Sequence, residues 1–191
     1  MNDWVQRKPV RLQGYDYSRA GYYFVTICAA MRKENIFAEI HLTSQTVGAA
    51  ALGGPSPVSA EGFDHPYAGL EAFDRLNVTL TPAGKIVKQH IENINNVYNG
   101  QAGIDCYTIM PDHIHIVVWI RTLGSGPPRA AAPTVTLPGI VNALKGLSSK
   151  KLGYSIWQRG YYEHIIRGEA DLQNIRQYVL SNPLKWTSDK E

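Results

Sequence analysis

Two histidines, His113 and His115, are the residues best placed for chemistry, because a single isoleucine separates them. On a β-strand, residues i and i+2 project from the same face, so both imidazoles would point one way and Ile114 into the opposite layer. Two same-facing imidazoles can hold one divalent cation. The run VVWI that follows is strongly apolar and favours a central strand, with the histidines at the mouth of a site. A pair of surface histidines beside a turn is the alternative that this spacing alone leaves open.

Tyr178 and Asn182 form a second candidate pair near the end of the sequence. At positions i and i+4 of a helix they would share one face, so a phenol and an amide oxygen could reach the same point. Tyrosine is a poor nucleophile at neutral pH because its pKa is about 10, and a divalent cation that polarises a phosphate would compensate. From spacing alone, a half-buried aromatic on an amphipathic helix is the favoured interpretation of Tyr178.

The segment over residues 157–167 (WQRGYYEHIIR) combines aromatic rings with cations. Single-stranded nucleic acid is bound by both, since bases stack on rings and phosphates pair with cations. A hydrophobic arm that packs on the sheet is an equally weighted alternative, and His164 is expected to be a hydrogen-bonded structural residue. The candidate DNA-binding residues are Arg159, Tyr161, Tyr162 and Arg167, together with Lys150 and Lys151 in the preceding segment.

The pattern of apolar and turn residues predicts the elements that must position these side chains. We expect strands over residues 22–28, 35–40, 76–80, 104–110 and 114–120, a short strand or irregular arm over 157–166, and helices over 82–98, 134–152 and 168–181. Thr81 and Pro82 predict the start of the first helix, and Asn182 and Pro183 are expected to break the last one. The order of the elements predicts an α+β protein with a small antiparallel sheet and helices packed on one face.

Length and composition are those of a folded domain. The 191 residues are 44% hydrophobic and 18% charged, which is unlike a disordered chain. They predict a single domain over residues 1–191 that carries a loop insertion at about 46–70, where Gly, Pro and Ala recur without periodicity. The net charge of +3 permits a polyanionic partner without requiring one.

The cysteines and the hydropathy of the chain bear on its compartment. Cys28 and Cys106 each lie in an apolar run and are expected to be buried free thiols, which points to a reducing compartment. The first residues hold no apolar core of the signal-peptide type, and no apolar stretch approaches the length of a membrane helix. These features predict a cytoplasmic protein.

Three stretches together resemble the single-tyrosine transposases of the HUH class, in particular the REP-associated tyrosine transposases and their insertion-sequence relatives. They are YYFVTIC, MPDHIHIVVWI and WQRGYYEHIIRGEADLQNIRQYVLSNPLKW, and they cover roughly half of the chain. The order PDHIH, WQxGYYxHxIR and a Y…NPxKW ending is hard to obtain by chance. The insertion at 46–70 departs from the compact members, which have a short connection there.

The resemblance implies a ferredoxin-like (RRM-like) fold with a C-terminal catalytic helix. It implies Mg²⁺ or Mn²⁺ held by His113 and His115, with Asn182 as third ligand, and Tyr178 as the nucleophile. The implied activity is nicking and joining of single-stranded or hairpin DNA through a 5′-phosphotyrosine intermediate. A homodimer that exchanges the tyrosine helix is among the assemblies it implies, so the active site could form in cis or in trans.

Two other functions compete with this interpretation. The first is a non-catalytic module that binds single-stranded nucleic acid on the same fold. The second is a different metalloenzyme with HxH ligands, but such sites usually add a carboxylate and a further histidine. Asp112 is adjacent to the pair, and it would project to the other face if the strand had already begun there.

Overall fold

The computed structural model describes residues 12, 14–31, 35–42, 76–121 and 135–188, and the predicted insertion at 46–70 lies outside them. The main sheet contains four antiparallel strands in the order β4-β5-β1-β6. A separate two-stranded sheet pairs β2 with β3. The bounds are β1 Gly21–Cys28, β2 Ala38–Leu42, β3 Leu76–Leu80, α2 Pro82–Val97, β4 Ala102–Ile109, β5 His113–Ile120, α3 Leu137–Leu152, β6 Tyr162–Ile166 and α4 Glu169–Ser188.

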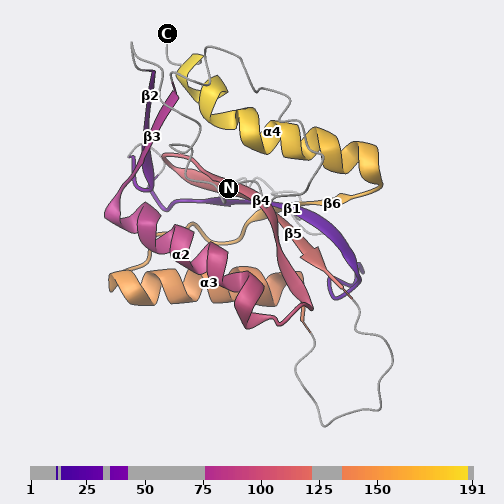
Figure 1. Ribbon diagram of the computed structural model, residues 1–191. Helices are drawn as coiled ribbons and strands as arrows, with labels where there is room; N and C mark the ends of the chain where they lie inside the picture. The colour runs from indigo at the N-terminus through magenta and orange to yellow at the C-terminus, as the bar shows by residue number, and fades with distance from the viewer. Residues whose placement is uncertain (1–11, 13, 32–34, 43–75, 122–134, 189–191) are drawn as a thin grey trace, which may run out of the picture.

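The connectivity is that of a ferredoxin-like fold. The path β1-α2-β4-β5-α3-β6 places β5 between β1 and β4, which makes a split βαβ arrangement. The β2–β3 pair is inserted between β1 and α2. Helices α2 and α3 cover one face of the sheet and α4 lies over the other (Figure 1). The predicted α+β class and antiparallel sheet are confirmed, with two helices on one face and the C-terminal helix opposite them.

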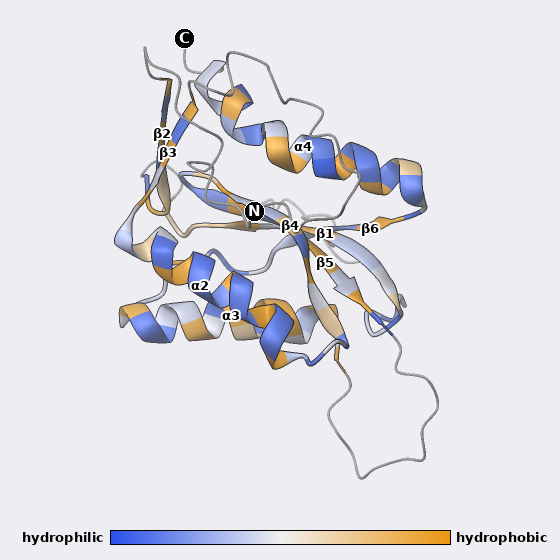
Figure 2. Ribbon diagram, in the orientation of Figure 1, coloured by the Kyte–Doolittle hydropathy of each residue, from blue (hydrophilic) through white to orange (hydrophobic). Residues whose placement is uncertain are grey.

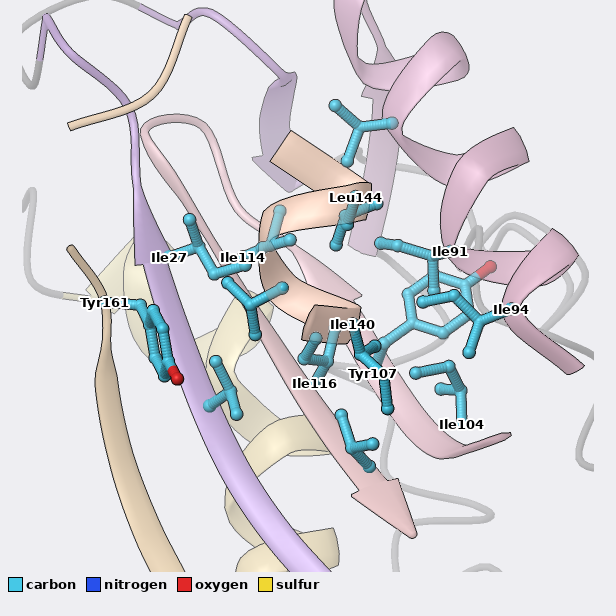
Figure 3. Packing of buried hydrophobic residues seen from close by; sticks show 14 of the residues in the cluster. Ile27, Ile91, Ile94, Ile104, Tyr107, Ile114, Ile116, Ile140, Leu144 and Tyr161 are labelled. Carbon is cyan, nitrogen blue, oxygen red and sulfur yellow. The ribbon is translucent and has the colours of Figure 1, made fainter. Parts of the chain in front are cut away.

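The main core lies between the sheet and helices α2 and α3. Ile91 and Ile94 of α2 and Ile140 of α3 pack against inward-facing strand residues such as Ile114 and Ile116 (Figure 3). In Figure 2 the helices alternate hydrophobic and hydrophilic residues along their length, as expected for helices with one buried side. Burial of each large aliphatic side chain contributes about 1.5–3 kcal/mol, so this face holds most of the apolar stabilisation.

Helix α2 begins where the sequence predicts. The Thr81 hydroxyl oxygen accepts a hydrogen bond from the Gly84 amide at 3.1 Å, and Pro82 occupies the first turn. Gly84 lies against the backbone of the preceding segment, since an added Cβ would stand 1.9 Å from the Phe37 carbonyl oxygen. Glycine is therefore required at this close approach.

The predicted break of the last helix at Asn182 and Pro183 is wrong, because α4 continues through Pro183 to Ser188. An internal proline removes one backbone hydrogen bond and costs about 3 kcal/mol. Packing of the last turn offsets this cost: Trp186 lies against a small cluster that includes Ile40, Leu76 and Met110. Tertiary contacts with the β2–β3 pair thus extend the helix past the expected stop.

Smaller differences concern the ends of elements. The second strand spans Ala38–Leu42 instead of 35–40. The segment 157–166, predicted to be either a short strand or an irregular arm, contains the strand β6. Neither Cys28 nor Cys106 is in a disulfide, as predicted, but only Cys28 is buried and Cys106 is partly exposed. None of the described helices combines the length and apolar character that crossing a membrane requires.

Helix α4 is held by apolar and ionic contacts on the face of the sheet opposite α2 and α3. Leu172 and Val179 pack with Val117 in a second buried cluster. Arg176 forms a two-pronged ion pair with Asp105, with Nε–Oδ2 at 2.8 Å and Nη2–Oδ1 at 2.5 Å. Asp105 lies at an irregularity in the β4–β5 pairing. The Asp105 side chain is 14% exposed, so water would solvate its carboxylate poorly if Arg176 were removed.

Removing one partner of this pair should destabilise the protein more than its surface position suggests. Arg176→Ala and Asp105→Ala are each expected to lower the free energy of unfolding by about 2–4 kcal/mol, with a coupling of about 1–3 kcal/mol in the double variant. Urea denaturation measures these values. Gln177→Ala, at an exposed neighbouring position of α4, is the control and should change little. Additive losses from the two substitutions would contradict the role of the pair.

Candidate functional site

The candidate site is built on the register of the two central strands. Strand β5 pairs with β1 so that His115 lies opposite Thr26 and His113 opposite Cys28. The neighbouring Ile114 is fully buried in the main core, so the alternation turns both imidazoles toward the α4 side. His115 is buried and His113 is partly exposed. The prediction that both histidines share a face of a central strand is confirmed.

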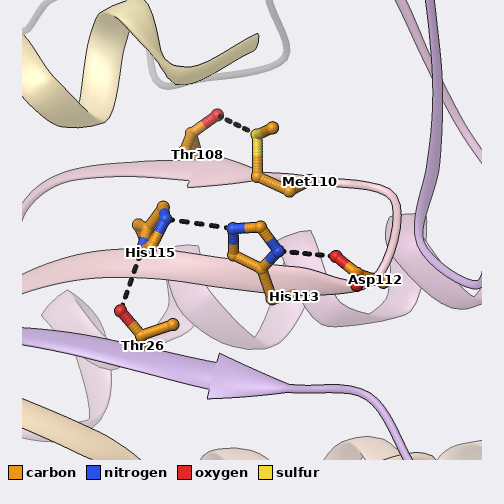
Figure 4. Close-up of polar contacts among 6 residues, drawn as sticks. All are labelled: Thr26, Thr108, Met110, Asp112, His113 and His115. Atoms are coloured by element: carbon orange, nitrogen blue, oxygen red, sulfur yellow. Dashed lines mark hydrogen bonds and ion pairs between the residues drawn. The ribbon is translucent and has the colours of Figure 1, made fainter. Parts of the chain in front are cut away.

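A chain of polar contacts orients the two rings (Figure 4). His115 Nδ1 lies 2.8 Å from Thr26 Oγ1, and His113 Nδ1 lies 2.6 Å from Asp112 Oδ1. The two Nε2 atoms face one another at 3.0 Å. When each Nδ1 donates its proton to its oxygen partner, both Nε2 lone pairs are directed into the same space.

This arrangement fits a divalent cation. Two adjacent ligands of an octahedral ion at ~2.1 Å lie about 3.0 Å apart, which is the separation of the Nε2 atoms. A metal-binding histidine usually donates a hydrogen bond from its other ring nitrogen to an oxygen atom, which fixes the orientation of the ring. Burial and the neighbouring His113 lower the pKa of His115 to about 3, so its imidazole is neutral, as a ligand must be.

Among the described residues, a third protein ligand would have to be a group other than another histidine, cysteine or carboxylate. Over the ranges that the structure describes, no cluster of three His, Cys, Asp or Glu side chains is suited to a metal. Asn182 is 9% exposed and stands one turn after Tyr178 on α4. Its role as a ligand stays a prediction.

Tyr178 lies beside the histidines of its own chain. The centre of its ring is 5.3 Å from that of His115 and 5.8 Å from that of Phe24. Phe24 in turn stacks on His115 with ring centres 5.2 Å apart. The Tyr178 side chain is 41% exposed, so its phenol is accessible from solvent while one edge of the ring contacts the site.

Comparison with known proteins bears on the family. No model of a known protein family matches the chain. An uncharacterised protein of Haemophilus influenzae is 30% identical over 200 residues, which are 96% of this chain and 92% of that protein. A second protein of that organism, provisionally named a REP-associated tyrosine transposase, is 32% identical over 82 residues, or 40% of this chain and 47% of its own length.

A solved structure of a REP-associated tyrosine transposase bound to a REP hairpin has the same fold. It covers 92% of this chain and 73% of that one, with a TM-score of 0.53 and 15% sequence identity. Across 40% of its length the chain is thus similar in sequence to a protein named as a REP-associated tyrosine transposase, and it shares the fold of a solved member of that family. The relative aligned over nearly the whole chain has no assigned function, so the activity of this chain has to be argued from its own residues.

The candidate DNA-binding residues of this chain fall into different environments. Tyr162 is 56% exposed and pairs with Thr26, in the cross-strand row that holds His115. Arg159 and Arg167 are exposed near the two ends of β6. These residues stay predictions, and their positions leave them accessible to a nucleic acid.

The other candidates are less favourably placed. Tyr161 is 7% exposed and belongs to the main core (Figure 3), so its ring offers little area on which a base could stack. Lys150 and Lys151 are exposed in the last turn of α3, on the layer opposite α4. His164 is hydrogen-bonded to Asp171 at 2.9 Å, as expected for a structural histidine.

Sequence reasoning missed four residues of the site. Thr26 and Phe24 come from a strand distant in sequence, and only the pairing register brings them to His115. Asp112 would point to the opposite face only if the strand had already begun there, but β5 begins one residue later and the Asp112 carboxylate bonds His113. Its position directly before the histidine pair was the available signal. No sequence signal pointed to Lys185. Its Nζ lies 5.5 Å from the centre of the Tyr178 ring.

Phe24 should hold the rings of His115 and Tyr178 in place. Phe24→Leu removes two aromatic contacts from a half-buried position, and we expect the free energy of unfolding to fall by about 1–2 kcal/mol. The NMR signals of the His115 ring protons should shift because a neighbouring ring current is lost. The exposed His41 ring is the control in the same spectrum. Unchanged His115 signals would argue against the stacked arrangement.

Proposed function

We propose that this chain nicks and rejoins DNA strands in a metal-dependent reaction in which Tyr178 is the nucleophile. One observation carries the proposal: the Tyr178 ring lies against His115, whose Nε2 faces that of His113 at 3.0 Å. A nucleophile and a candidate cation site therefore adjoin in one chain. Similarity over part of the sequence to a protein named as a REP-associated tyrosine transposase supports the same activity.

The metal would be Mg²⁺ or Mn²⁺, held by His113, His115 and Asn182. When bound, such an ion supplies positive charge that offsets the charge developing on a phosphate. Asp112 and Thr26 contribute by fixing the orientation of the two imidazoles. Their contacts leave both Nε2 atoms available, which is the property the ion requires.

Tyr178 would act on a phosphodiester of single-stranded or hairpin DNA. Its phenol oxygen forms a bond to phosphorus, the bond from phosphorus to the 3′ oxygen breaks, and a 5′-phosphotyrosine results. The phenol proton passes to solvent, and the departing 3′ oxygen takes up a proton from water. Attack by a 3′ hydroxyl on the phosphotyrosine reverses these changes and rejoins the strand without an external energy source.

Two observations support DNA as the proposed substrate: the ligand of a structural relative and the exposed side chains of this chain. The relative of known structure was solved with a REP hairpin bound. In this chain, three exposed side chains lie in or near the edge strand β6, namely Arg159, Tyr162 and Arg167. They offer cations for phosphates and a ring for a base.

Tyr178→Phe should abolish the covalent adduct while leaving DNA binding within about twofold, because only the attacking oxygen is removed. A denaturing gel with a labelled hairpin oligonucleotide and Mn²⁺ detects the adduct, and fluorescence anisotropy measures binding. Tyr154→Phe, at an exposed site after α3, is the matched control. An adduct that persists in Tyr178→Phe would remove this residue from the role. Binding by the wild-type chain with no adduct would favour a non-catalytic binding module.

The histidines should hold the metal. The double variant His113→Ala, His115→Ala is expected to lose stoichiometric Mn²⁺ binding in calorimetry and to lower adduct formation by roughly 100-fold or more. Asn182→Ala should weaken Mn²⁺ binding without abolishing it. His41→Ala, at an exposed histidine on β2, is the control. Equal Mn²⁺ affinity in the double variant and the wild type would reject the assignment.

A further inference from the structure

The ammonium group of Lys185 lies beside the proposed nucleophile. Its Nζ stands 5.5 Å from the centre of the Tyr178 ring, although the two residues are seven positions apart on α4. Helical side chains lean toward the N-terminus of their helix, so a long side chain two turns later can reach back to this ring. The lysine side chain is exposed and therefore accessible to a ligand.

Lys185 has no acidic partner among the described residues. Residues 177–188 of α4 contain no Asp or Glu. The two acidic residues of the helix, Glu169 and Asp171, lie in its first turn, where Asp171 bonds His164. The carboxylate next to the histidines, Asp112, is bonded to His113. Within the described part of the chain, a positive charge thus remains beside Tyr178 with no carboxylate paired to it.

We infer that Lys185 binds the scissile phosphate during the attack by Tyr178, a role that rests on the proposed function. The phenol oxygen lies on the rim of the ring that Lys185 covers, so a phosphate attacked by that oxygen comes within reach of the ammonium. Lys185 donates a charge-assisted hydrogen bond to a non-bridging oxygen. The bond changes remain those of the proposed reaction, since Lys185 transfers no proton and keeps its charge in the phosphotyrosine state.

A purely structural role for Lys185 predicts different behaviour. Contact between an ammonium and a tyrosine ring would hold the ring in place, and this contact does not depend on the charge of the DNA. Phosphate binding depends on that charge. A substrate in which the scissile linkage is an uncharged methylphosphonate therefore separates the two roles.

The first experiment measures single-turnover adduct formation on a hairpin oligonucleotide with Mn²⁺. Lys185→Met, which keeps the length of the side chain without the charge, should slow the reaction by roughly 30- to 300-fold. Lys185→Arg should recover the rate to within about tenfold of wild type, because the charge is restored. Lys85→Met, at an exposed lysine of α2 on the opposite side of the sheet, should react at the wild-type rate.

The second experiment measures binding in the Tyr178→Phe background, where no adduct forms. Adding Lys185→Met should weaken binding of the normal oligonucleotide by about three- to tenfold, and it should leave binding of the methylphosphonate oligonucleotide unchanged. Equal effects on both oligonucleotides, or a wild-type adduct rate in Lys185→Met, would overturn the role of Lys185 alone. Absence of any adduct with the wild-type chain would instead overturn the proposed function, and the role of Lys185 with it.

Discussion

The antiparallel register between β1 and β5 is the constraint on which the rest of the site depends. It sets His115 opposite Thr26 and turns the imidazoles away from the main core. A slip of one residue would exchange the two faces of the strand, bury both rings under α2 and α3, and expose Ile114 and Ile116. Because both isoleucines are fully buried, such a slip would forfeit several kcal/mol of apolar burial. The hydrophobic core therefore fixes the direction of the histidines.

Helix α4 completes the site, and its contacts position a side chain that is itself half exposed. Tyr178 stands between Arg176, which pairs with Asp105, and Val179, which is fully buried. Farther along, Trp186 anchors the last turn against the β2–β3 pair. The helix is thus held on both sides of the tyrosine. This arrangement allows the phenol to stay accessible while its ring keeps a defined place beside the imidazoles.

Local patterns predicted much of this structure, and most of the misses involve contacts that are distant in sequence. The start of α2 followed from the cap at Thr81, and the shared face of the histidines followed from the two-residue period of a strand. Thr26 could not be assigned, because its role depends on the pairing of strands. The continuation of α4 through Pro183 depends on the packing of Trp186. The burial of Tyr161 depends on which side of β6 meets the core, which a short segment does not reveal.

The two faces of the sheet have different roles: one contributes stability and the other holds the polar site. The side under α2 and α3 is apolar and supplies the stability that allows polar groups on the other side. A buried polar atom without a partner costs about 1–3 kcal/mol, and Thr26 and Asp112 remove that cost at the two Nδ1 atoms. When both neutral rings donate through Nδ1, the facing Nε2 atoms of His113 and His115 carry no proton, so neither can donate to the other. A single group that accepts both lone pairs satisfies them more fully, and a divalent cation is such a group. The same contacts that reconcile the imidazoles with burial therefore favour the proposed metal.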